Sequence, residues 1–218
     1  MTRQQVSAIL TEYGYKLKIE TDKLLEDKGC YEAYKMMQRT GDIWQYGTFR
    51  FEREPTPYFN VEKEFDTEDK AAKYYLMRRL KFHYSNSYGK FSRKYGELRY
   101  IYENFDVEKL ESVLRKSGIP KTYFCVGTDT TGVINAVQLF RAEGGYCYAV
   151  IRGGQRISRA VDTGSDRGKL ALWDAASSAM MGIYLYYMYD TEIAPVFRKH
   201  GVLDEITDAD FLTFYWGV

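Results

Sequence analysis

Each half of the chain runs through the same order of sequence patterns, and this internal repeat constrains the fold more than any other feature. Apolar residues at helical spacing come first and end at a glycine, over residues 6–14 and again over residues 107–118. An extended stretch follows each of them, at residues 16–21 and 122–127. The repeat therefore predicts that a helix opens both halves and that strands follow it.

A β-hairpin is predicted next in each half. The predicted hairpins join residues 31–38 to 43–52 in the first half and residues 133–140 to 146–152 in the second half. Each turn contains glycine, and β-branched and aromatic residues flank it on both sides, which is typical of paired strands.

After the hairpin, each half passes through a further strand to the same dipeptide, Asp66-Thr67 in the first half and Asp162-Thr163 in the second. Asp and Thr are residues that cap helices, and a helical pattern follows both dipeptides. The apolar face of the first helix contains Ala71, Ala72, Tyr75, Leu76, Leu80 and Phe82, and that of the second contains Leu170, Trp173, Ala176, Met180, Ile183, Tyr184 and Tyr187. We therefore predict an α+β protein of two tandem related halves, each with a helix, an antiparallel β-meander and a packing helix.

Two segments lie outside the repeat. The predicted organisation is a first half at residues 1–84, an aromatic and basic connecting segment at 85–104, a second half at 105–200 and a helical tail at 201–218. The connecting segment is rich in Tyr, Lys and Arg and does not have the overall Pro/Gly/Ser composition of a free linker, so it is expected to be docked. In the tail, Thr207 followed by Asp210 has the form of a capping box and predicts a last short helix.

Composition bears on location and on partners. The 31 Lys and Arg residues nearly cancel the 30 Asp and Glu residues, so no overall charge attracts nucleic acid or anionic membrane. The first ten residues lack the pattern of a signal peptide, and no apolar run is long enough to span a membrane. Cys30, Cys125 and Cys147 are odd in number and far apart, which suits buried thiols in a reducing compartment. We expect a cytoplasmic protein.

No catalytic, cofactor or metal site is predicted. His83 and His200 stand far apart and away from cysteines, and neither glycine pair, Gly144-Gly145 or Gly153-Gly154, lies in a phosphate-binding sequence. The acidic residues between positions 62 and 69 offer two interpretations, a metal or acid–base site, or acids at a helix start that favour the helix dipole. We favour the second, and we expect a non-enzymatic protein. An enzyme with an unfamiliar site is the alternative.

The segment from Lys81 to Arg99 alternates cationic and aromatic residues, a pattern that single-stranded nucleic-acid binders use. The balanced net charge and the lack of a longer basic stripe weigh against nucleic acid. A protein-binding or merely solvated role is favoured for this segment. Tyr makes up 21 of the 36 aromatic residues of the chain, and it suits sheet surfaces and protein interfaces that are wet when free and dry when bound.

The run from Gly41 to Glu54, followed by Phe65 to Leu76, resembles small bacterial immunity proteins of polymorphic toxin systems, nearest to the families called immunity protein 59 and immunity protein 61. The resemblance covers about residues 31 to 80, with a weaker echo at 134 to 187, where Tyr146 replaces Trp44. It implies a non-enzymatic inhibitor that binds the toxin domain of a secreted protein in the producer's cytoplasm. The alternative is an adaptor or regulator that binds nucleic acid through residues 81–99.

An inhibitor of this kind needs a surface with aromatic and Arg anchors at its centre. We predict that the connecting segment supplies this surface and that the hairpin from Trp44 to Arg53 is a second contact. The candidate toxin-binding residues are Trp44, Tyr46, Arg53, Tyr84, Tyr88, Phe91, Arg93, Tyr95, Arg99 and Tyr100. The alternative is that many of these aromatic side chains are buried where the two halves meet.

Overall fold

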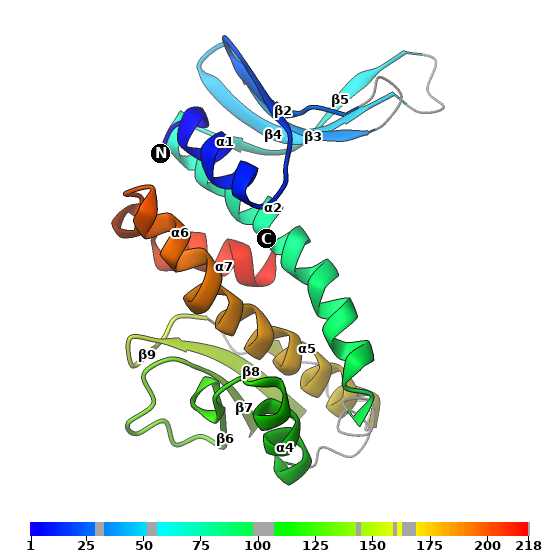
Figure 1. The fold of residues 1–218 in the computed structure, drawn as a ribbon, viewed down its shortest axis with the longest axis vertical. Coiled ribbons are helices and arrows are strands. Elements are labelled where there is room, and N and C mark those ends of the chain that lie inside the picture. The colour runs from blue at the N-terminus through cyan, green and yellow to red at the C-terminus, as the bar shows by residue number, and fades with distance from the viewer. Residues whose placement is uncertain are drawn as a thin grey trace. The chain divides into compact units, whose positions relative to one another are not determined.

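The computed structural model describes residues 1–28, 33–51, 56–97, 107–142, 145–158, 161–162 and 169–217. It is an α+β fold with two β-sheets (Figure 1). The chain divides into two compact units. Unit 1 comprises Met1–His83 with Ala194–Val218, and unit 2 comprises Tyr84–Ile193.

Unit 1 is built on an antiparallel sheet in the order β1-β2-β3-β4-β5, so each strand pairs with the next along the chain. Its strands are β1 (Leu17–Glu20), β2 (Lys23–Glu26), β3 (Tyr34–Thr40), β4 (Ile43–Arg50) and β5 (Tyr58–Phe65). Its helices are α1 (Arg3–Glu12), the first part of α2 (Glu68–Lys94), α6 (Ala194–Lys199), the short 3-10 turn η4 (Leu203–Glu205) and α7 (Asp208–Trp216). The predicted meander of the first half is confirmed, and β2 is a strand that the sequence analysis did not identify.

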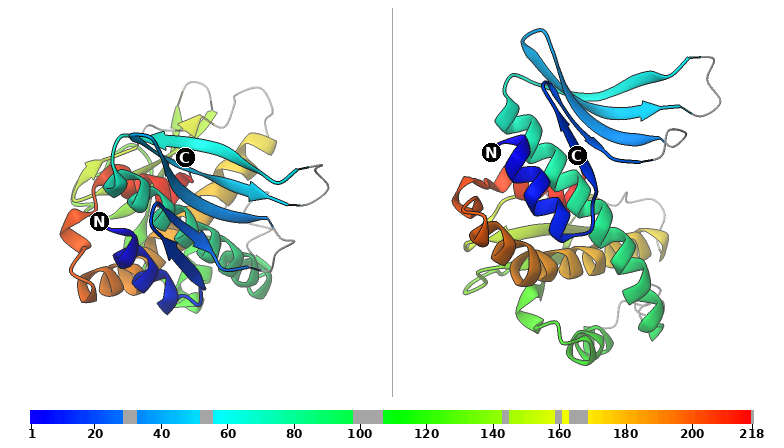
Figure 2. Two further views of the ribbon diagram at one scale, coloured as in Figure 1. Left: turned by 90° about the horizontal axis from the view of Figure 1, so that it is seen from above. Right: turned by 45° about the horizontal axis from the view of Figure 1, so that its top comes forward.

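Helices α1 and α2 lie on the same face of this sheet (Figures 1 and 2). Leu24, Met37 and Tyr46 point from the sheet into the core, and all three are almost completely buried. From α2, Tyr75 meets Tyr46 edge to face with ring centroids 5.8 Å apart. Full burial of one large apolar side chain contributes about 1.5–3 kcal/mol, so this contact layer holds the helices on the sheet.

A buried ion pair joins α2 to the same face of the sheet. Arg79 Nη2 lies 2.6 Å from Glu26 Oε1, and both side chains are less than one-tenth exposed. The backbone amide of Lys35 donates to the other carboxylate oxygen at 2.9 Å, and the Tyr15 hydroxyl donates to the carbonyl of Arg79 at 3.0 Å. Removing one partner of such a pair leaves an uncompensated buried charge, so it fixes the position of α2 more strictly than apolar contact alone does.

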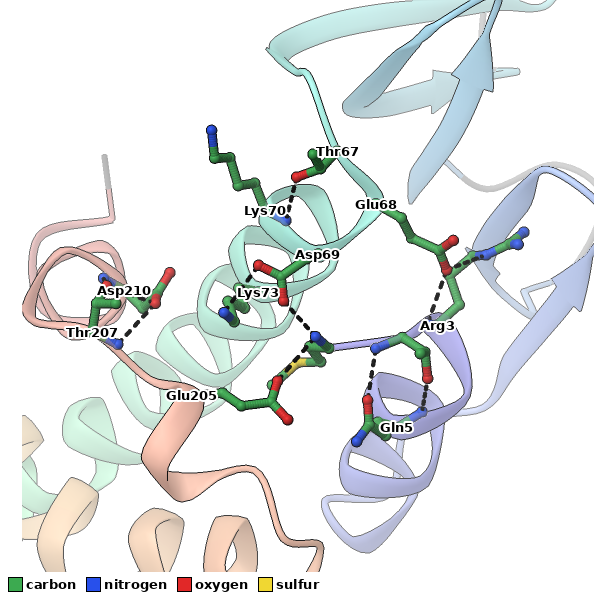
Figure 3. A network of polar contacts seen from close by, with 12 residues as sticks. Arg3, Gln5, Thr67, Glu68, Asp69, Lys70, Lys73, Glu205, Thr207 and Asp210 are labelled. Atoms are coloured by element: carbon green, nitrogen blue, oxygen red, sulfur yellow. Dashed lines mark hydrogen bonds and ion pairs between the residues drawn. The ribbon is translucent and has the colours of Figure 1, made fainter.

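Polar contacts fix both ends of unit 1 (Figure 3). Thr207 and Asp210 form the capping box that the sequence predicts at the start of α7, with each side chain accepting from the backbone of the other residue. Thr2 and Gln5 form a second capping box at the start of α1. Arg3 Nε donates to Glu68 at 2.9 Å, which ties the first turn of α1 to the first turn of α2.

Unit 2 contains a mixed sheet in the order β10-β8-β7-β6, with β9 paired to β8. The strands are β6 (Phe124–Val126), β7 (Ala136–Ala142), β8 (Gly145–Arg152), β9 (Gln155–Arg156) and β10 (Val161–Asp162). The helical segments are the second part of α2, α4 (Val107–Ser117), the 3-10 turn η1 (Lys121–Tyr123), α5 (Lys169–Met188) and the π-helical segment η3 (Tyr189–Ile193). Helix α5 packs against β7 and β8, and the core includes Val137, Val150, Met180 and Ile183.

The antiparallel meander predicted for the second half is wrong at its first strand, because β6 pairs with β7 in parallel, whereas β7 and β8 form the predicted antiparallel hairpin. Parallel neighbours ordinarily need a crossover of a dozen or more residues. Here β6 has only three residues, so residues 127–135 are enough to return the chain to the start of β7. The described structure thus shows two different sheets, and it does not show that the halves are related.

The junctions and the connecting segment also differ from prediction in part. Asp66 and Thr67 lie between β5 and α2, as expected, whereas Asp162 lies within β10 and Thr163 is outside the described residues. The expected separate segment at 85–104 begins inside α2, which continues without a break to Lys94. Phe82 is 54% exposed and does not belong to the buried face of that helix. The C-terminal residues from Ala194 onward belong to unit 1.

Two glycine-to-alanine substitutions test the packing of this fold. A Cβ at Gly47, beside the bulge between β4 and β5, would lie 2.1 Å from the carbonyl oxygen of Asn60. We expect Gly47→Ala to lower the free energy of unfolding by about 1–3 kcal/mol through overpacking. Gly89 lies inside α2 with nothing within 4 Å of its added Cβ, so Gly89→Ala is expected to raise stability by about 0.5–1 kcal/mol. Urea unfolding of both variants measures these changes, and equal effects would contradict the assigned bulge.

Candidate functional site

Successive residues of a strand point to opposite faces of its sheet, and this alternation divides the hairpin of β3 and β4 into two sets of side chains. Trp44 pairs with Arg39 and Tyr46 pairs with Met37, on the face that α1 and α2 cover. Gln45, Gly47 and Phe49 belong to the other face. The two aromatic residues that the sequence analysis selected from β4 therefore point into the core, and Phe49 points away from it.

The face of the unit 1 sheet that α1 and α2 leave uncovered carries an apolar cluster, which we call the open face. Its apolar members are Leu25, Tyr34, Met36, Phe49, Phe51, Phe59 and Val61. The rings of Tyr34 and Phe49 stack with centroids 5.3 Å apart, and Phe51 meets Phe49 edge to face at 4.8 Å. Figures 1 and 2 show no described helix of unit 1 on this side of the sheet.

Gly47 allows the open face to pack closely. The ring of Phe59 approaches to 2.9 Å from the position that a Cβ of Gly47 would occupy. Met36, opposite Gly47 in the pairing of β3 with β4, is only 3% exposed although it lies on this face. Val61 remains 40% exposed. The open face is thus an ordered surface of half-buried aromatic rings.

Polar side chains flank the apolar cluster at the end of the sheet nearest the β3–β4 turn and along β1. Gln45 Nε2 donates to Glu64 at 2.8 Å, and Thr40 donates to Gln45 at 3.1 Å. Along β1, Lys18 and Glu20 form an ion pair at 2.9 Å. Burial, followed by the negative charge of Glu20, raises the pKa of Tyr34, so its hydroxyl stays neutral at physiological pH. An apolar centre with a polar rim is the arrangement of a protein-binding surface.

Three of the predicted contact residues are buried. Trp44 is 7% exposed and lies 5.0 Å below the guanidinium of Arg3, and Tyr46 is 1% exposed. Burial, with the charge of Glu62 as the next cause, raises the pKa of Tyr46 to about 12. Tyr84 is 2% exposed, and its hydroxyl donates to Glu192 at 2.7 Å. These side chains stabilise the cores and are not available as surface anchors in this conformation.

The aromatic residues predicted from the connecting segment come together on one side of α2. Tyr88, Phe91 and Tyr95 follow one another at spacings of three and four residues, and adjacent rings lie 5.8 and 4.9 Å apart. Tyr184 of α5 contacts this strip, with centroids 5.4 Å from Tyr88 and 5.0 Å from Phe91. The strip is a half-buried seam between two helices of unit 2. Arg93 is exposed, whereas Arg53, Arg99 and Tyr100 lie outside the described residues.

The acidic segment at the end of β5 and the start of α2 is paired with cations and polar groups. Lys70 pairs with Asp66. Figure 3 shows that Lys73 pairs with Asp69 and Arg3 with Glu68. Among the described residues, no group of three or more His, Cys, Asp or Glu side chains is placed to hold a metal ion. His83 packs on the ring of Tyr13, and His200 contacts Glu12. Asp66, Glu68 and Asp69 thus form ion pairs at the start of α2, whereas Glu64 contacts Gln45 on the sheet.

The cysteines differ in exposure. Cys147 is buried, as expected, and Cys125 is half-buried. Cys30 is outside the described residues.

No family model, no curated protein and no solved structure matches this chain. No helix among the described residues is long and apolar enough to cross a membrane. The function must therefore be argued from the surfaces of the two units.

Two aromatic substitutions on β4 test the assignment of the faces. We expect Tyr46→Ala to cost about 3–5 kcal/mol of stability, because it leaves a cavity between the sheet and α2. Phe49→Ala removes two ring contacts on the open face, which are worth about 0.5–1.5 kcal/mol each. Thermal unfolding of the two variants measures the difference. A larger loss for Phe49→Ala would mean that the faces are reversed.

Proposed function

We propose that this chain is a non-enzymatic immunity protein, which binds the toxin domain of a secreted bacterial protein in the producer's cytoplasm and neutralises it by covering or distorting its active site. The observation that carries the proposal is the open face of unit 1. Ordered aromatic rings at the centre of a polar rim are costly to leave in water, and they supply the anchors that dominate protein–protein affinity.

The resemblance to the immunity protein families supports the same function, because its best part, residues 41–54 and 65–76, contributes both Phe49 and Phe51. The hairpin that we predicted as a second contact becomes the main contact. Its contact residues are those that point to the open face, such as Phe49, and not Trp44 and Tyr46. A relation between the two halves, by duplication of one ancestral unit, remains part of the proposal.

A partner of this surface has defined chemistry. It presents an apolar protrusion or a flat apolar patch to the open face, with groups that pair with Lys18, Gln38 and Glu64 at the rim. A specific complex buries about 800 Å² on each partner, so the contact extends beyond the apolar cluster to this rim.

The nucleic-acid alternative depends on rings in residues 81–99 that are free to stack on bases. Tyr88 and Phe91 already pack against Tyr184, and Lys81 donates to the carbonyl of Tyr215. Burial lowers the pKa of Lys81 to about 8, which weakens its value as a phosphate contact. These contacts favour a protein partner over a nucleic acid.

The test is a binding experiment with the variable C-terminal domain of a large secreted protein encoded next to this chain, in a catalytically disabled form. We expect Phe49→Ala/Val61→Ala to weaken binding at least about 30-fold, because hot-spot residues are worth about 2 kcal/mol or more. Phe82→Ala, which removes an exposed aromatic ring from α2 of the same unit, is the matched control and is expected to change affinity less than about threefold. Isothermal titration calorimetry measures all three proteins.

A third variant separates the two candidate surfaces. Tyr88→Ala/Arg93→Ala/Tyr95→Ala changes the helical strip, and we expect it to protect cells from the active toxin as the parent does when its circular dichroism is unchanged. Loss of protection by this variant, with full protection by Phe49→Ala/Val61→Ala, would place the contact on α2 instead. A parent protein that binds no neighbouring toxin domain would contradict the proposed function itself.

A further inference from the structure

Unit 2 contains a cavity of about 500 Å³ that the proposed function does not use. Its walls are the segment 121–124 of η1 and β6, the loop residues 132–135 and Asp190. Ile134 is 67% exposed and Phe124 is half-buried, so one side of the cavity is apolar. Asp190 is the only carboxylate among the described residues that line it.

Asp190, which lines this cavity, lies in a segment of π-helix. It belongs to η3, where the α-helical pattern of α5 changes to five residues of π-helix before α6 begins. A π-helical turn is less stable than the α-helical one it replaces, and such turns occur frequently at functional sites. The other acidic residue of this turn, Glu192, accepts a hydrogen bond from the hydroxyl of Tyr84, so the two carboxylates of η3 have separate partners.

The carboxylate of Asp190 is only partly compensated. The Tyr123 hydroxyl donates to Oδ2 at 2.9 Å, and no described residue donates a hydrogen bond to Oδ1. Burial raises the pKa of Asp190 in spite of this hydrogen bond and of the positive charge of Arg152. The ionised carboxylate is therefore less well solvated here than in water. A positively charged hydrogen-bond donor would replace the stabilisation that it loses with its hydration.

The other charged groups around Asp190 are already engaged. Arg152 of β8 lies over the ring of Tyr189 at 5.6 Å, and Lys121 of η1 pairs with Glu111 at 3.3 Å. Tyr187 of α5 meets Tyr123 edge to face at 5.6 Å. Tyr123 itself has a raised pKa, because of burial first and of Asp190 second, so it remains a neutral donor.

We propose that this cavity binds a cationic amine, either an ammonium or a guanidinium group on an aliphatic stem. The cation donates to Oδ1 of Asp190, where a charge-assisted hydrogen bond is about twice as strong as a neutral one. The stem lies along Phe124 and Ile134. The inference is independent of the open face, which belongs to the other unit. The same chemistry is offered by a free polyamine and by a Lys or Arg side chain of a protein.

The proposal is tested on the full chain by NMR titration with n-butylammonium and n-butylguanidinium, with n-butanol and butyrate as neutral and anionic ligands of matched length. We expect saturable shifts of amides in residues 121–135 and 189–193 with the two cations, and affinity at least about tenfold weaker for the other two ligands. Butanol binding as tightly as butylammonium would overturn the proposal. The absence of shifts with both cations at 20 mM would also overturn it, because that concentration is well above a Kd of about 1 mM.

Substitution provides the second arm. Asp190→Asn keeps the shape of the side chain and removes its charge, and we expect it to weaken cation binding at least about tenfold. Asp129→Asn makes the same change outside the cavity, where Asp129 bonds to Thr131, and is expected to leave binding unchanged. Equal binding to the parent and to folded Asp190→Asn would overturn the proposal.

The pH dependence of the parent decides the matter if Asp190→Asn does not fold. The cation pairs with the ionised carboxylate, so affinity is constant at neutral pH and falls as pH drops through the pKa of Asp190. Because this pKa is raised, the fall begins at a higher pH than for an ordinary Asp. Binding that does not change down to pH 4 would contradict the assignment. Spermidine and Nα-acetyl-lysine amide, which keeps its side-chain ammonium, then distinguish a free polyamine from a protein side chain as the ligand. Tighter binding of either one supports the site.

Discussion

Coverage of one face of the five-stranded sheet by α1 and α2 is the constraint on which the rest of unit 1 depends. The buried pair of Glu26 and Arg79 fixes α2 on that face, because any shift of the helix would separate two charges that have little other solvation. Once one face is core, strand alternation assigns the side chains of β3 and β4 to the core or to the opposite surface, and the pairing across the bulge assigns those of β5. Tyr46 and Phe49, three residues apart, therefore have opposite roles.

This alternation of strand side chains between two faces explains which features of unit 1 could be predicted from the sequence. The first helix, the hairpin of β3 and β4, and the capping box at Thr207 and Asp210 each depend on contacts between near neighbours, and all were predicted correctly. The face that each strand residue occupies depends on where the helices pack, which is a distant event in the sequence. Trp44 and Phe49 are both aromatic residues of one strand, and nothing local distinguishes the face that each occupies. The structure buries Trp44, which was among the predicted contact residues.

The errors in the second half have a similar origin. A hairpin can be predicted from its turn residues and from the β-branched and aromatic residues on both sides of the turn. The parallel pairing of β6 with β7 involves only three pairs of residues, and no local sequence pattern indicates it. The extension of α2 beyond His83 was missed because polar and aromatic residues replace the apolar pattern there. Its stability comes from Tyr184 of α5, which supplies a packing partner for Tyr88 and Phe91 about a hundred residues away in the chain.

Asp190 shows the same limit at the level of chemistry. In the sequence it is one of 30 acidic residues, and it follows a helical pattern that predicts core. Its place in a cavity depends on a π-helical turn, which has no sequence signature, and on Tyr123, which comes from η1. The open face belongs to unit 1 and the Asp190 cavity belongs to unit 2. A chain whose composition is balanced overall can thus hold two chemically different surfaces, because each depends on local burial and not on net charge.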